Sequence, residues 1–125
     1  DASYKLGSEI REGFNWEQFI GNRKEMLKVC PEIYFEIAPT VSSLNINNLP
    51  ELHQELVNLN LIDINNIYLN LLERPLHYNI QTLSKLEKLK AENSIKKHEN
   101  WLKKKHNSNK ILKEFENLRC YLNLK

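Results

Sequence analysis

Three short polar side chains, Thr40, Ser42 and Asn45, have types and a spacing that suit a small-ligand site. They follow a run at 33–38 in which apolar and polar residues alternate, and this period of two indicates a strand. A helix-forming segment begins soon afterwards, which makes the loop the carboxyl end of a strand in a βα unit. In α/β sheets and barrels, ligands bind at that end of the strands. The same side chains could instead serve only as turn and capping groups, because they commonly bond to nearby backbone.

The other side chains that could do chemistry give weaker signals. Glu36 lies among the strand residues, and a carboxylate is costly to bury unless it is paired or hydrated, so it lines a pocket or lies on an exposed edge. Cys30 and Cys120 are too far apart for a metal-ligand motif or a disulfide framework. The four histidines show no metal-ligand spacing, and we expect His98 to be solvated within a lysine-rich segment.

The bulk composition limits the class of protein. The 125 residues are 41% hydrophobic and 27% charged, as in an ordinary globular domain with a packed core. The net charge of +2 is too small by itself to indicate a nucleic-acid-binding protein. No apolar run approaches the roughly 18–20 residues that span a bilayer. We therefore expect a reduced, cytoplasmic protein.

The elements that must position the polar residues can be read along the chain. Asn15 and Asn48 are expected to cap helices, with Gln18 and Glu51 at the capping-box positions. Trp16, Phe19 and Tyr34 are expected in the core. The predicted elements are a strand end at 1–3, a loop at 4–14, a helix at 16–29, a strand at 33–41, a helix at 48–60, a strand at 67–72, and a helix over 81–125 broken near 107–108.

Strands that alternate with helices of this length indicate an α/β fold with parallel, right-handed crossovers. About three strands are too few to close a barrel, so we expect a section of a barrel or a small open sheet. Residues 85–113 hold ten lysines against three glutamates, which marks 85–125 as a basic helical extension. Because the chain starts at Asp1 within an apparent strand end, we expect it to be a piece of a longer protein.

Four segments together resemble a known family. They are an Asp-x-Ser strand end at 1–3, IREGFNW at 10–16, EIAPTVSSLNINNLPEL at 36–52, and IYLNLLERPLHYNIQTL at 67–83. This order is similar to the second half of the radical S-adenosylmethionine (SAM) core, in the branch that carries twitch domains. The resemblance implies that 1–84 is the C-terminal half of a partial (β/α)6 TIM-like barrel, followed by the helical extension at 85–125.

The resemblance also implies cofactors that this chain cannot hold alone. The family binds a 4Fe–4S cluster through a Cys-x3-Cys-x2-Cys loop, and that loop is absent from this sequence. By resemblance, Arg11 meets the SAM carboxylate, because a guanidinium makes two parallel hydrogen bonds to a carboxylate. The implied SAM-binding residues are Ser3, Arg11, Thr40, Ser42, Asn45, Asn70 and Leu71, and the implied substrate-pocket residues are Asp1 and Glu36.

Three functional hypotheses follow. In the first, the chain is the C-terminal part of a radical SAM enzyme that works with the missing N-terminal half of the barrel on a small-molecule, peptide or nucleotide substrate. In the second, it is a non-catalytic α/β binding module whose Lys-rich helical tail docks on a protein or nucleic-acid partner. In the third, it belongs to an unrelated TIM-like barrel enzyme.

Overall fold

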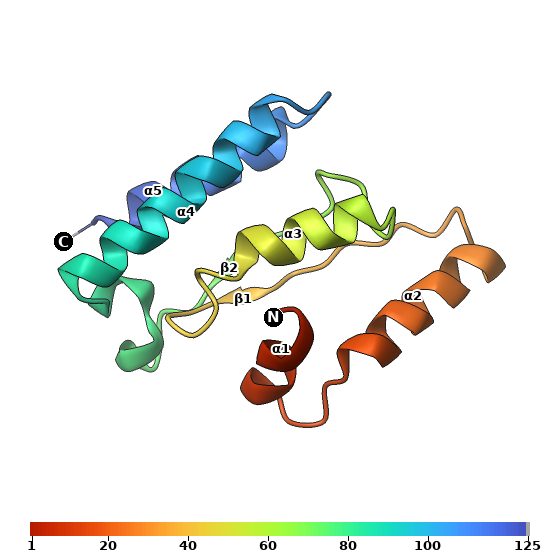
Figure 1. Cartoon of the computed structure of the whole chain (residues 1–125), viewed down its shortest axis with the longest axis horizontal. Helices are drawn as coiled ribbons and strands as arrows, with labels where there is room; N and C mark the ends of the chain where they lie inside the picture. The colour runs from red at the N-terminus through yellow and green to blue at the C-terminus, as the bar shows by residue number, and fades with distance from the viewer. Residues whose placement is uncertain (125) are drawn as a thin grey trace.

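The computed structural model describes residues 1–124, which are mainly helical. Figure 1 shows α3 lying along two short strands, with α4 and α5 on one side of this unit and α1 and α2 on the other. The described elements are α1 (Tyr4–Ile10), α2 (Trp16–Val29), β1 (Thr40–Val41), α3 (Leu49–Asn58), β2 (Asn70–Leu71), 3-10 turns at Leu76–Tyr78 and Ile80–Thr82, α4 (Lys85–Lys103) and α5 (Asn109–Leu122).

The expected section of a partial barrel with about three parallel strands is wrong. Within residues 1–124 the sheet consists of β1 and β2 alone, paired in parallel with Thr40 opposite Asn70, and an isolated bridge between Ile37 and Ile67 extends the pairing. The predicted strand end at 1–3 does not pair as a strand. Its contacts with the β1 region run largely through side chains, as when the Thr40 N–H donates to Asp1 Oδ1 at 3.0 Å.

The alternation that predicted the strands does set which face each side chain occupies. Phe35 and Ile37 pack into the core, whereas Glu36 is exposed. Tyr34 is also on the exposed side, with 71% of its surface accessible, so its expected place in the core is wrong. Along the second segment, Ile67 and Leu69 pack inward and Tyr68 and Asn70 are exposed.

The helix signals gave mixed outcomes. α2 begins where expected, because the Asn15 side chain accepts a hydrogen bond from the Gln18 N–H at 2.8 Å. Asn48 also precedes a helix, but its side chain makes no capping bond. It binds Ser3 instead: the Ser3 N–H donates to Asn48 Oδ1 at 2.9 Å, and Asn48 Nδ2 donates to Ser3 Oγ at 3.0 Å. A tertiary contact therefore replaces the predicted local cap.

The segment predicted as a loop at 4–14 contains α1. Gly7 allows this helix to pack closely, because a Cβ at that position would lie 2.6 Å from the Ala2 carbonyl oxygen and 2.7 Å from the Phe14 ring. Gly13 then turns the chain toward α2 with a φ of 84°, a conformation that glycine adopts without strain.

The C-terminal helices form a hairpin. The predicted break near 107–108 is confirmed, since α4 ends at Lys103 and α5 begins at Asn109. The predicted start at 81 is too early because a 3-10 turn occupies Ile80–Thr82. Ser84 and Glu87 then form a capping box that begins α4.

Two apolar clusters form the core of the described chain. One joins the strands to the C-terminal hairpin and includes Val41, Ile67, Ile95, Leu102 and Phe115. The other lies between α2 and α3 and includes Trp16, Leu52 and Leu56. Helices α4 and α5 thus share a core with the strands. None of the described helices combines the length and apolarity that crossing a membrane requires.

Candidate functional site

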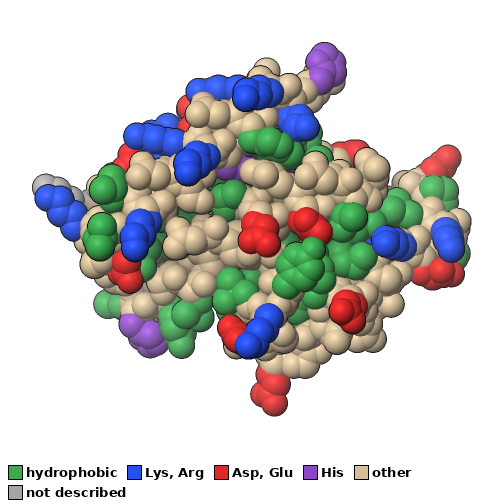
Figure 2. Space-filling model, in the orientation of Figure 1, with side chains coloured by type: hydrophobic (Ala, Val, Ile, Leu, Met, Phe, Trp, Pro, Cys, Tyr) green, Lys and Arg blue, Asp and Glu red, His purple; other side chains and the backbone are tan. Residues whose placement is uncertain are grey.

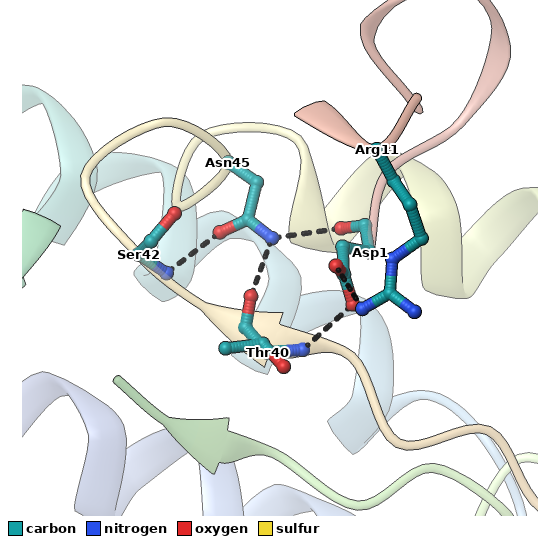
Figure 3. Close-up of polar contacts among 5 residues, drawn as sticks. All are labelled: Asp1, Arg11, Thr40, Ser42 and Asn45. Atoms are coloured by element: carbon teal, nitrogen blue, oxygen red, sulfur yellow. Dashed lines mark hydrogen bonds and ion pairs between the residues drawn. The ribbon is translucent and has the colours of Figure 1, made fainter. Parts of the chain in front are cut away.

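Several predicted site residues meet at the carboxyl end of β1 (Figure 3). The Asp1 carboxylate accepts a hydrogen bond from the Thr40 N–H and pairs with Arg11 Nη2, each at 3.0 Å. Asn45 Nδ2 donates to the Asp1 carbonyl oxygen at 2.8 Å and to the Thr40 carbonyl oxygen at 2.7 Å. The contacts bring together residues that lie up to 44 positions apart in the sequence. They fix the segment that precedes α1 against the end of β1.

Three of these predicted residues use their polar atoms to hold the loop. Asn45 is 1% exposed, and its Oδ1 also accepts from the Ser42 N–H at 2.8 Å. The Ser42 hydroxyl accepts from the Leu44 N–H at 3.2 Å. Ser3 is 2% exposed and is held by Asn48. These contacts correspond to the turn and capping role that such side chains commonly play.

Other predicted residues lie on an open sheet face. Helices α2 and α3 contact the face that carries Phe35 and Ile37, and the strand alternation directs Glu36, Thr40 and Asn70 to the opposite face. The Thr40 hydroxyl and the Asn70 amide make no hydrogen bond to another residue of the described chain. Their polar atoms are therefore free to meet a ligand.

Leu71 and Arg11 differ in what they can offer. Leu71 packs against the apolar cluster beneath the sheet, so it lies on the covered side. The Arg11 side chain is 64% exposed, and its single ion pair with Asp1 leaves other N–H groups of the guanidinium accessible. An exposed guanidinium next to Asp1 has the chemistry to bind a carboxylate.

A cavity of about 240 Å³ lies beside this network. Asp1 and Glu36 are among its lining residues, and Phe14, Trp16 and Phe19 form an aromatic wall. The two residues predicted to line a substrate pocket therefore border the same cavity.

The implied iron–sulfur cluster does not fit the residues of this chain. In the described residues, no group of three or more His, Cys, Asp or Glu side chains is placed to hold a metal ion. Both cysteines are free thiols. Cys30 lies at the C-terminal end of α2, and Cys120 lies in α5. A 4Fe–4S cluster needs thiolate ligands that would have to come from another part of the protein.

The SAM part of the implied site fits in part. Thr40 and Asn70 have spare hydrogen-bonding groups at the open face, and Arg11 has spare N–H groups next to Asp1. Ser3, Ser42 and Asn45 have their polar groups engaged within the chain. Among the described residues, no buried side-chain polar atom is left without a partner, so a ligand is not needed to complete the loop.

A buried histidine pair lies outside what the sequence patterns predicted. His98, expected to be solvated, is 1% exposed and lies between α4 and α3. His53 Nδ1 is 2.8 Å from His98 Nε2, His53 Nε2 is 2.8 Å from the Ile64 carbonyl oxygen, and Gln54 Nε2 is 2.9 Å from His98 Nδ1. Phe115 stacks on His53 and Trp101 stacks on His98, and each of the two aromatic rings also makes an edge contact with the other histidine.

The partners of the two rings fix where their protons lie. A carbonyl oxygen only accepts, so His53 carries its proton on Nε2 and offers Nδ1 as an acceptor. His98 then donates from Nε2 and accepts at Nδ1 from the Gln54 amide. Burial lowers the pKa of His53 to about 4 and, together with the charge of His53, that of His98 to about 3. Both rings are neutral near pH 7, and all four ring nitrogens have partners.

The basic surface predicted for the tail is present on the C-terminal hairpin. Figure 2 shows Lys and Arg side chains gathered over α4. Lys103, Lys104 and Lys105 are exposed at its end, and Lys105 Nζ lies 4.9 Å from the centre of the Trp101 ring. On the inner side, Arg119 makes two hydrogen bonds to Glu99, at 2.8 and 3.0 Å.

Comparisons with models of known protein families, with curated proteins and with solved structures gave no match to this chain.

Proposed function

We propose that this chain forms the C-terminal part of a radical SAM enzyme and contributes the wall that binds SAM and part of a substrate pocket. The observation that carries the proposal is that Thr40 and Asn70 lie side by side on one open sheet face, with the Arg11 guanidinium paired to Asp1 at the edge of the same strand. Polar groups at the carboxyl ends of parallel strands are where ligands of α/β proteins bind.

The residues of this chain would bind and orient, while the cluster ligands would come from elsewhere in the protein. Arg11 would hold the SAM carboxylate, and Thr40 and Asn70 would donate and accept hydrogen bonds along the rest of the ligand. With an electron from the reduced cluster, bound SAM would be cleaved to methionine and a 5′-deoxyadenosyl radical, and this radical would take a hydrogen atom from the substrate. A cytoplasmic location belongs to the same proposal.

A titration with SAM tests this function. In two-dimensional NMR spectra of the 15N-labelled chain, millimolar SAM is expected to shift the signals of Arg11, Thr40 and Asn70 and to leave those of α5 in place. Arg11→Ala should weaken binding about tenfold, because a charge-assisted hydrogen bond contributes about 1.5–3 kcal/mol. Arg74→Ala is the matched control, since Arg74 is an exposed arginine in another loop. Shifts that are absent, or that survive Arg11→Ala unchanged, would refute the assignment.

A second candidate function rests on the lysines of α4. Their exposure supports a role in docking on an anionic partner, as in the binding-module hypothesis. Binding of a short duplex oligonucleotide that weakens steeply with salt, and that is lost on replacing Lys103, Lys104 and Lys105 by Gln, would support this candidate. Binding that is unaffected by those changes would exclude this surface.

A further inference from the structure

The outer edge of the β1 segment, on the side away from β2, has backbone groups without partners. Ile37 directs its groups toward β2: its N–H donates to the Asn66 carbonyl oxygen at 3.1 Å, and its carbonyl oxygen accepts from the Tyr68 N–H at 2.8 Å. Peptide groups alternate sides along a strand, so those of Glu36 and Ala38 point to the opposite edge. Within the described chain, these N–H and C=O groups make no hydrogen bond.

At the carboxyl end of the same edge, side chains take the place of a neighbouring strand. The outward N–H of Thr40 bonds to the Asp1 carboxylate, and the outward carbonyl oxygen of Thr40 bonds to the Asn45 amide. Asp1 therefore lies where a neighbouring strand would end. From there the chain continues directly into α1.

The unpaired edge forms one wall of the 240 Å³ cavity. Residues Phe35 to Pro39, which carry this edge, line one side, and the aromatic residues Phe14, Trp16 and Phe19 line another, with Leu52 and Leu56 from α3. Unpaired main-chain groups beside an apolar wall suit an extended polypeptide, which gains hydrogen bonds along its backbone and buries alternate side chains. The groove thus has the chemistry of a strand-binding site.

We propose that this groove binds an extended polypeptide strand that pairs with β1 in parallel and ends at Asp1. A strand that arrives at Asp1 from the far end of the groove runs in the direction of β1, because Asp1 lies beside Thr40. Residues of α2 and α3 pack in one cluster, as expected when two successive right-handed crossovers place their helices on the same face. The inference rests on the proposed function in one respect, that this strand belongs to the part of the enzyme that carries the cluster ligands.

The test uses the full chain with a five-residue strand, Val-Thr-Val-Thr-Val, joined to the N-terminus of Asp1. The matched control carries Val-Pro-Val-Pro-Val, because proline cannot donate to a strand ladder. Amide hydrogen exchange is measured by NMR in both chains. The Val/Thr extension should slow exchange of the Ala38 and Glu36 N–H groups at least about tenfold relative to the control.

A second variant separates docking in the groove from general stabilisation. Ala38→Pro removes one outward N–H that has no partner, so the unextended chain should keep its thermal midpoint. The Val/Thr extension should raise the thermal midpoint of the original chain, and Ala38→Pro should abolish this rise. Equal exchange at Ala38 in the two extended chains, or slower exchange at Leu69 instead, would overturn the inference. Slowed exchange without SAM binding would refute the proposed function and leave the strand site standing.

Discussion

The buried histidine pair should make the stability of the fold fall steeply in mild acid. The perturbation is a change from about pH 7.5 to about pH 5.0, a range in which most carboxylates stay ionised. Both rings keep a pKa far below the ordinary value of 6.5 in the folded chain, chiefly because they are buried. Below about pH 6.5 the unfolded chain therefore binds more protons than the folded chain, and the free energy of unfolding decreases as the pH falls.

The size of the effect follows from the two pKa values. At about pH 5.0, protonation stabilises each unfolded histidine by about 2 kcal/mol, while rings with pKa values of about 4 and about 3 remain almost entirely neutral in the fold. The pair should therefore lower the free energy of unfolding by about 4 kcal/mol across this range. That is a large share of the roughly 5–15 kcal/mol that stabilises a typical domain.

Urea unfolding followed by Trp fluorescence measures this loss at each pH. The His98→Gln variant keeps an amide that can hydrogen-bond and removes one titrating ring, so its loss should be about 2 kcal/mol. His77→Gln is the control, because His77 is exposed and its replacement should leave the loss at about 4 kcal/mol.

Two results would refute the reasoning on the histidines. The first is a pH dependence that His98→Gln and His77→Gln reduce equally. The second is an NMR titration in which the rings of His53 and His98 become protonated near pH 6.5, or in which His53 carries its proton on Nδ1. Either result would mean that the rings are not the buried, neutral, hydrogen-bonded pair described above.

Two further predictions concern the packing around the site. Gly7→Ala should lower the free energy of unfolding by about 1–3 kcal/mol, because the added Cβ would lie 2.6 Å from the Ala2 carbonyl oxygen. Gly21→Ala, in α2 with no atom within 4 Å of the new Cβ, should raise it by up to about 1 kcal/mol, and equal effects of the two changes in thermal unfolding would contradict the close packing of α1. Asn45→Ala should cost about 2–4 kcal/mol, because three backbone groups lose their partner. The exposed Asn47→Ala should change the stability by less than about 0.5 kcal/mol, and an equally small effect at Asn45 would show that other contacts hold the loop.

Local sequence signals predicted those features that depend on near neighbours. The alternation at 33–38 correctly separated Phe35 and Ile37 from Glu36 onto opposite faces, because side chains alternate along a strand, but it did not show which of the two faces is covered. Asn15 and Gln18 correctly gave the start of α2. The break between α4 and α5 was also visible from the polar run near Asn107.

Features that depend on distant partners could not be read from local patterns. The strands are shorter than their alternation suggested, because a ladder also requires a partner along the whole edge, and Asp1 meets β1 through its side chain. Asn48 has the sequence context of a cap but binds Ser3. His98 has lysines for neighbours in the sequence, yet it is buried because His53, 45 positions away, faces it from α3.

The candidate site was predictable in outline and less so in detail. The sequence indicated a polar loop at the carboxyl end of a strand, and Thr40 and Asn70 do lie side by side on an open face. It left open whether Ser42 and Asn45 serve a ligand or the loop, and their contacts within the chain could be seen only once the N-terminal segment was placed against them. Whether a polar side chain has hydrogen bonds to spare for a ligand depends on partners that the tertiary structure brings to it.

The most direct test of the proposed function is the native polypeptide itself, isolated from its source and characterised by intact mass, peptide sequencing and electron paramagnetic resonance. We expect a polypeptide in which a Cys-x3-Cys-x2-Cys loop lies N-terminal to Asp1, with the spectrum of a reduced 4Fe–4S cluster after anaerobic reduction. A native polypeptide that lacks this cysteine triplet would contradict the radical SAM assignment, because Cys30 and Cys120 cannot replace it.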